Sequence, residues 1–241
     1  MPMLLLVHSP LVGPVSWLPT AGRLEGLGYE VVVPSLAGLT AAGPPYFARL
    51  ADAAAGAVGP GRPVVVVGHS RGGPLLPAVA DRIGGAVRGA LFVDSRQPHP
   101  GVSALDAMTP EARDQLIARA RDGRLPRWHE WFGSIAELGP DAEQRDRLVA
   151  EIEQLPLAYF AEPAPAVDPP ARCAYVQLSD AYREPADEAA RRGWPTYRAA
   201  ADHLAVLTWP ELAAGLVDAA VRSVAGGAAA GSAGSGTTSG S

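Results

Sequence analysis

PVVVVGHSRG, residues 63–72, joins four consecutive valines to a serine that lies between two glycines. Four valines are too few for a helix and too apolar for a half-exposed strand, so they predict a central parallel strand buried on both faces. The apolar residues 74–80 can then open a helix. A serine at such a strained strand-to-helix turn needs small neighbours, and the helix N-terminus directs backbone N–H groups toward an oxyanion beside it. The pattern predicts that Ser70 is a nucleophile.

Length and composition limit the class of protein. The chain has 241 residues, of which 48% are hydrophobic and 19% charged, which fits one large domain or one domain with an insertion. A net charge of −5 gives no basic surface for nucleic acid. The single cysteine, Cys173, excludes an internal disulfide and a multi-cysteine metal site. We therefore expect a cytoplasmic monomer or homodimer that acts on a small molecule, with no nucleic-acid or membrane partner.

Strand and helix patterns alternate along most of the chain, which predicts βαβ units and a mostly parallel, doubly wound sheet of the α/β class. The predicted strands cover residues 3–7, 29–33, 63–67, 89–93, 173–178 and 196–199. The predicted helices of this part cover residues 16–27, 46–58, 72–83 and 210–224.

The alternation stops between residues 96 and 170, where no strand is evident. Helices are expected at 109–121 and 141–153, followed by an extended arm with five prolines between residues 156 and 170. We interpret 96–170 as a helical cap inserted into a core made of 1–95 and 171–225. The aromatic residues between the two helices are expected to bind substrate: Trp128, Trp131 and Phe132. Residues 226–241 are Gly, Ser, Ala and Thr alone and are expected to be disordered.

A serine hydroxyl becomes a good nucleophile when a base takes its proton, and a carboxylate must orient that base. After a serine turn of this kind, the expected chain order is serine, acid, histidine. Of the five histidines, His203 has the right place, in a loop between the last strand and the final helix. The other four precede Ser70, adjoin it or lie in the insertion: His8, His69, His99 and His129.

Two carboxylates compete for the role of the acid. Asp180 is favoured because it follows the predicted strand 173–178, but Asp94 also ends a strand and is a serious rival. Glu184 and Asp187 are weaker candidates for the same role. Position along the chain leaves this choice open.

With these residues in place, the chain resembles the α/β-hydrolase superfamily from about Met3 to Val224. The matching segments are LLLVHS at 4–9 with Trp17 downstream, GHSRG at 68–72, FVDS at 92–95, and DHL at 202–204 before TWP at 208–210. The first and last look most similar to the small esterase and hydroxynitrile-lyase branch. The resemblance implies helices on both faces of a sheet of about six strands, a helical cap after the strand that ends at Asp94, and no cofactor or metal.

One segment departs from the superfamily's pattern. In most members a glycine follows the histidine after the first strand here, and a backbone N–H just beyond it helps to bind the oxyanion. This chain has Pro10 there, and proline has no N–H. The Arg71 N–H can supply one donor, whereas the second must come from Leu11 or from the Ser9 hydroxyl, and in the lyase branch a hydroxyl residue follows the same histidine. The Arg71 side chain either binds a substrate carboxylate or pairs with an acid of the cap.

The sequence thus favours a cofactor-independent serine hydrolase that cleaves an ester, lactone or thioester of a small, partly apolar molecule. Two alternatives remain: a lyase or cyclase that uses the same triad for acid–base chemistry, and a non-catalytic binding protein. Dinucleotide binding is not expected, because the first strand-to-helix turn lacks G-x-G-x-x-G.

Overall fold

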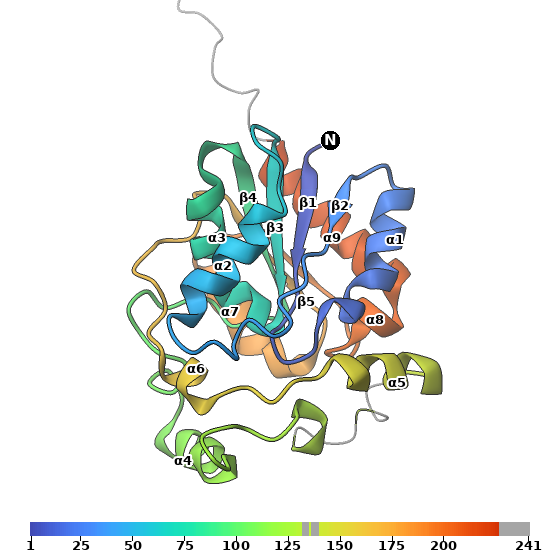
Figure 1. Ribbon diagram of the computed structural model, residues 1–241. Helices are drawn as coiled ribbons and strands as arrows, with labels where there is room; N and C mark the ends of the chain where they lie inside the picture. Colours follow the sequence, from blue (N-terminus) through green and yellow to red (C-terminus); the bar gives the residue numbers. More distant parts are fainter. Residues whose placement is uncertain (132–134, 136–139, 227–241) are drawn as a thin grey trace, which may run out of the picture.

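A six-stranded sheet forms the centre of the computed structural model, which describes residues 1–131, 135 and 140–226 (Figure 1). All neighbouring strands are parallel, in the order β2-β1-β3-β4-β5-β6. The predicted α/β class and the size of the sheet are confirmed. The strands are β1 (Met3–Val7), β2 (Val31–Val32), β3 (Val64–His69), β4 (Val87–Val93), β5 (Cys173–Gln177) and β6 (Thr196–Arg198).

Both faces of the sheet are buried, and successive strand residues point to opposite faces. Leu5 and Val7 belong to the hydrophobic cluster that contains α2 and α3, whereas Leu4 and Leu6 belong to the cluster that contains α1 and α9. Figure 1 shows α2 and α3 in front of the sheet and α9 behind it. The helices of the core are α1 (Leu18–Gly26), α2 (Tyr46–Gly56), α3 (Leu76–Ile83), α7 (Arg183–Arg191), α8 (Ala205–Thr208) and α9 (Pro210–Ala225).

Some elements differ from the sequence-based prediction. Strand β2 is limited to two residues, and helices α7 and α8 were not predicted. The buried positions of α7 are Pro185, Ala186 and Ala189, and such small side chains give little apolar periodicity among the charged ones. The predicted helix 72–83 begins instead as the 3-10 helix η2 (Ser70–Leu75) and becomes α3 at Leu76.

Residues 96–170 lie beyond the carboxyl ends of the strands, at the bottom of Figure 1. Both helices predicted in this segment are present and begin one residue later than expected: α4 (Pro110–Arg119), with Thr109 as its N-cap, and α5 (Ala142–Glu151), with Asp141 as its N-cap. The arm with the prolines also contains a short helix, α6 (Leu157–Ala161), which the sequence analysis missed.

Carboxylates of residues 96–170 hold backbone N–H groups of the core, among them the first two of helix α2. Charge-assisted hydrogen bonds of this kind are among the stronger ones in proteins. The pairs are Glu151 with Val15 at 2.8 Å, Glu153 with Gly38 at 2.8 Å, and Glu162 with Tyr46 and Phe47, each at 2.7 Å. The insertion is therefore fastened at several separate points of the core.

The described part of the chain contains no helix that is both long and apolar enough to cross a bilayer. The tail that was predicted to be disordered lies, after Gly226, outside the described residues.

Candidate active site

Ser70 lies at the sharp turn between β3 and η2, with a φ of 53°. This left-handed conformation is strained for a residue with a side chain. The neighbouring glycines are required by close backbone contacts: a Cβ on Gly68 would lie 2.8 Å from the carbonyl of Gly72, and a Cβ on Gly72 would lie 2.3 Å from the carbonyl oxygen of Val7. The glycines of the motif therefore let the turn fit against β1.

His203 contacts both partners that a catalytic base needs. Its Nε2 lies 3.0 Å from Ser70 Oγ, and its Nδ1 lies 3.1 Å from Asp94 Oδ2. The residue precedes α8 and is only 6% exposed. A histidine with Nδ1–H donating to a carboxylate keeps Nε2 free to accept the serine proton.

Asp94 follows β4 and is completely buried. Besides facing His203, its carboxylate accepts hydrogen bonds from the Leu178 N–H at 2.6 Å, the Ser179 N–H at 3.1 Å and the Ser179 hydroxyl at 2.6 Å. These donors come from the chain just after β5. They satisfy the buried charge and fix its direction toward the imidazole.

The prediction that Asp180 orients His203 does not agree with this geometry. Asp180 is exposed and pairs with Arg183, one turn further along the chain. The preceding residue, Ser179, is the one that points inward, onto Asp94. Glu184 is also exposed, and Asp187 pairs with Arg198 at 2.6 Å, so neither approaches the base.

Tyr182 is part of the site and was missed by the sequence analysis. Its ring stacks on His203, with centroids 4.8 Å apart and an interplanar angle of 7°. Burial raises the pKa of the Tyr182 phenol, partly offset by hydrogen bonding with Ser70, so the hydroxyl keeps its proton at neutral pH. Its position shortly after β5 could have indicated this role, because the loops at the carboxyl edge of a parallel sheet form the binding site.

Two further histidines are structural. His69 Nε2 donates to the His203 carbonyl oxygen at 2.9 Å, and burial holds the pKa of His69 well below its usual value. His8 donates from Nδ1 to the Ser9 carbonyl oxygen at 2.8 Å and accepts the Leu36 N–H at Nε2, at 3.0 Å. Burial lowers the pKa of His8 to about 4. Both rings are thus neutral and hold loops around the site.

The segment at Pro10 gives a mixed result for the oxyanion donors. The Ser9 hydroxyl is buried and accepts the Leu11 N–H at 3.2 Å, which closes a local turn. Among the described residues, Leu11 lines the pocket at Ser70 and Ser9 does not. Arg71 directly follows Ser70 at the start of η2, where backbone N–H groups lack helical acceptors. Ser9 thus has a structural role in this turn.

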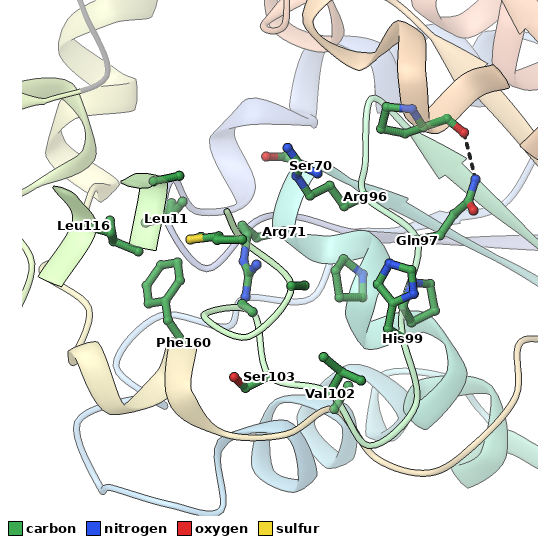
Figure 2. A pocket seen from close by; sticks show the side chains of 18 of the residues that line it. Leu11, Ser70, Arg71, Arg96, Gln97, His99, Val102, Ser103, Leu116 and Phe160 are labelled. Carbon is green, nitrogen blue, oxygen red and sulfur yellow. Dashed lines mark hydrogen bonds between the residues drawn. The ribbon is translucent and has the colours of Figure 1, made fainter. Parts of the chain in front are cut away.

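A pocket of about 690 Å³ opens above Ser70, between the carboxyl edge of the sheet and residues 96–170 (Figure 2). Apolar groups from several segments line it, among them Phe47, Leu116 and Phe160. Trp128 and Trp131, which are expected to bind substrate, also line it, whereas Phe132 lies outside the described residues. Within residues 1–131, 135 and 140–226, no group of three or more His, Cys, Asp or Glu side chains could hold a metal ion.

Comparison with known proteins agrees with this architecture. The model of a family described as "Alpha/beta hydrolase family" matches residues 4–220. The chain belongs to the α/β-hydrolase family. No curated protein matches its sequence.

Several solved α/β-hydrolase structures are similar over nearly the whole chain. An extracellular α/β-hydrolase from a Paenibacillus species, described as sharing structural and functional homology with tobacco salicylic acid binding protein 2, is 19% identical, with a TM-score of 0.64 over 93% of this chain and 99% of that one. Tomato methylketone synthase I, complexed with β-ketoheptanoate, is 13% identical, with a TM-score of 0.71 over 90% and 96%. A pyrethroid hydrolase from Sphingobium faniae JZ-2 is 18% identical, with a TM-score of 0.61 over 90% and 96%. At these identities the likeness concerns the fold.

Proposed function

We propose that this α/β-hydrolase-family protein is a serine hydrolase that cleaves an ester, lactone or thioester of a small, partly apolar molecule. One observation carries the proposal: His203 lies within hydrogen-bonding distance of Ser70 on one side and of the buried Asp94 on the other. The esterase-like descriptions of the pyrethroid hydrolase and of a methylesterase from Arabidopsis support it by analogy of fold.

The reaction follows from the positions of these groups. Ser70 Oγ attacks the substrate carbonyl carbon while His203 Nε2 takes the hydroxyl proton. The imidazolium, stabilised by Asp94, passes this proton to the leaving alcohol or thiol as the bond to the carbonyl breaks. A water molecule then attacks the acyl-serine ester, again with His203 as the base, and releases the acid and free Ser70. Each half of the cycle consumes and returns one proton at His203.

The oxyanion needs at least two donors in this scheme. The Arg71 N–H is one of them. Since Pro10 lacks an N–H and the Leu11 N–H is held by Ser9, we assign the second donation to the Tyr182 hydroxyl, which is protonated and in contact with Ser70.

Covalent labelling tests the proposal directly. A fluorophosphonate probe should modify the native protein at Ser70 and leave Ser70→Ala unlabelled, since the hydroxyl is the attacking group. The Ser70→Ala variant should fold normally, because the residue is only partly buried at a turn. A native protein that resists the probe, or a Ser70→Ala variant that keeps most of its ester hydrolysis, would refute the serine mechanism.

Pro10 favours a second candidate. With one backbone donor fewer for a tetrahedral oxyanion, the site is also suited to acid–base chemistry by His203 without an acyl-serine, as in a lyase or cyclase step. The structural similarity to tomato methylketone synthase I, a protein described in complex with a β-keto acid, is compatible with this candidate. An acyl-enzyme burst in rapid kinetics supports the hydrolase, and turnover of a substrate without any burst or labelling supports the alternative.

A further inference from the structure

Arg71 extends its side chain into the pocket from the residue after the nucleophile. Figure 2 shows it in the middle of the lining residues, beside Phe160. Its Cζ lies 4.8 Å from the centre of the Phe160 ring and 5.3 Å from that of Tyr159. These cation–π contacts with two rings, whose planes lie at 82° to each other, help to hold the guanidinium in place without neutralising its charge.

This cation lacks an acidic partner among the residues that the structure describes. Arg71 Nε is buried and makes no hydrogen bond to any of them. The side chain has two possible roles, substrate binding or pairing with an acid of the cap, and no described acid of residues 96–170 pairs with it. The positive charge is thus left without a counter-charge, and a guanidinium is matched best by a carboxylate that accepts two N–H groups side by side.

Counted together with Arg71, the charged side chains of the pocket lining are three arginines and two glutamates. Two more arginines line it, Arg96 and Arg119, and neither is paired with a described acid; Arg119 lies over the Trp131 ring at 5.8 Å. The acids of the lining are Glu184, which is exposed, and Glu188, which pairs with Arg192. The pocket therefore presents net positive charge to whatever enters it.

We infer that the pocket is built for a substrate that carries a carboxylate besides its scissile bond, and that the guanidinium of Arg71 binds this carboxylate from the pocket lining. The inference names the substrate class of the proposed hydrolase and so rests on that function. The anionic group lies against the Phe160 side of the pocket, while the scissile carbonyl lies at Ser70. A neutral ester of the same shape leaves the charge of Arg71 without a counter-charge and is the poorer ligand.

Binding to the Ser70→Ala protein tests the subsite apart from the chemistry. Calorimetric titration with octanoate and with octanamide compares a carboxylate with a neutral group of similar size. We expect octanoate to bind at least about tenfold more tightly, and Arg71→Met to abolish this preference. Arg62→Met, which removes the same charge from an exposed site outside the pocket lining, should preserve it. Octanamide binding shows that each variant is folded, and Arg71→Lys serves as a milder second variant with a reduced preference.

Equal affinities for octanoate and octanamide, or a preference that survives Arg71→Met, would overturn the subsite. Hydrolysis of 4-nitrophenyl glutarate against 4-nitrophenyl pentanoate by the native protein then tests the link to catalysis. A higher kcat/KM for the glutarate ester, by about tenfold, is expected. If neither ester is cleaved while the octanoate preference holds, the hydrolase proposal fails and the carboxylate subsite stands. If both esters are cleaved equally and octanoate has no advantage, the subsite fails and the hydrolase stands.

Discussion

Asp94 accepts hydrogen bonds from two backbone N–H groups and a hydroxyl before His203 is counted. A carboxylate fixed in this way cannot swing to another partner without leaving buried donors unpaired. It also ties the end of β4 to the chain after β5. The residue therefore has a positioning role for two elements besides its contact with the imidazole.

Replacing each of the two candidate acids, Asp94 and Asp180, by asparagine should show which one orients His203. Asp94→Asn should lower kcat for ester hydrolysis on the order of 10⁴-fold, because the amide no longer holds the imidazole in the right tautomer or stabilises its charge. Asp180→Asn should change kcat little, because Asp180 is exposed and pairs with Arg183. Steady-state kinetics of both variants on one ester checks this, and the opposite ranking would return the role to Asp180.

A second pair of variants addresses the oxyanion. Tyr182→Phe keeps the ring that stacks on His203 and removes the hydroxyl, so kcat should fall by roughly 10²–10³ with KM little changed. Ser9→Ala should leave kcat nearly unchanged, since the Ser9 hydroxyl closes a local turn with Leu11. A large loss in Ser9→Ala together with an unaffected Tyr182→Phe would assign the donor to Ser9 instead.

At the scale of elements, the turn after β3 depends on backbone approach. Gly72→Ala should destabilise the fold by on the order of 1–3 kcal/mol or more, because the new Cβ meets the Val7 carbonyl oxygen at 2.3 Å and backbone must shift to relieve the clash. Gly215→Ala is the matched control, since its Cβ meets nothing within 4 Å on α9, and it should stabilise by about 0.5–1 kcal/mol. Urea unfolding of both variants measures the difference, and equal effects would contradict the steric argument.

The elements also show what a sequence can and cannot reveal. The valine run of β3 and the alternation of strands and helices predicted the parallel sheet. A strand that is buried on both faces must be apolar at every position, and this can be seen in the sequence. The serine turn and His203 followed from local pattern and chain order. The choice between Asp94 and Asp180 did not, because it depends on which side of the chain faces inward two residues after β5 ends. Tyr182 was missed for the same reason, since only the fold brings its ring onto His203.

For the whole molecule, the buried histidines predict how stability changes with pH. The pKa of His8 falls from an ordinary 6.5 in the unfolded chain to about 4 in the fold, so the unfolded chain binds the proton more readily between these values. The free energy of unfolding should therefore decline as the pH falls from about 6.5 toward 4, with a contribution from His8 on the order of 3 kcal/mol. His69, whose pKa is also lowered by burial, acts in the same direction.

Denaturant unfolding at a series of pH values checks this. His8→Gln should show a smaller decline over that range, whereas His99→Gln, at an exposed position, should follow the native protein. A native protein whose stability rises as the pH falls from 6.5 to 4 would contradict the assignment of neutral, buried imidazoles.

The attachment of residues 96–170 has a consequence for protein engineering. Three glutamates accept hydrogen bonds from main-chain N–H groups of the core: Glu151, Glu153 and Glu162. The core therefore contributes no side chain to these bonds. These bonds do not depend on the side chains of the donating residues, but Gly13 is fixed, since a Cβ there would meet Glu151 at 2.5 Å, and the rings of Tyr46 and Phe47 also pack on Tyr159. A graft of residues 96–170 onto a different core would give that core a new ceiling for its pocket, provided that it repeats the backbone paths at these N–H groups and keeps the aromatic side chains at positions 46 and 47.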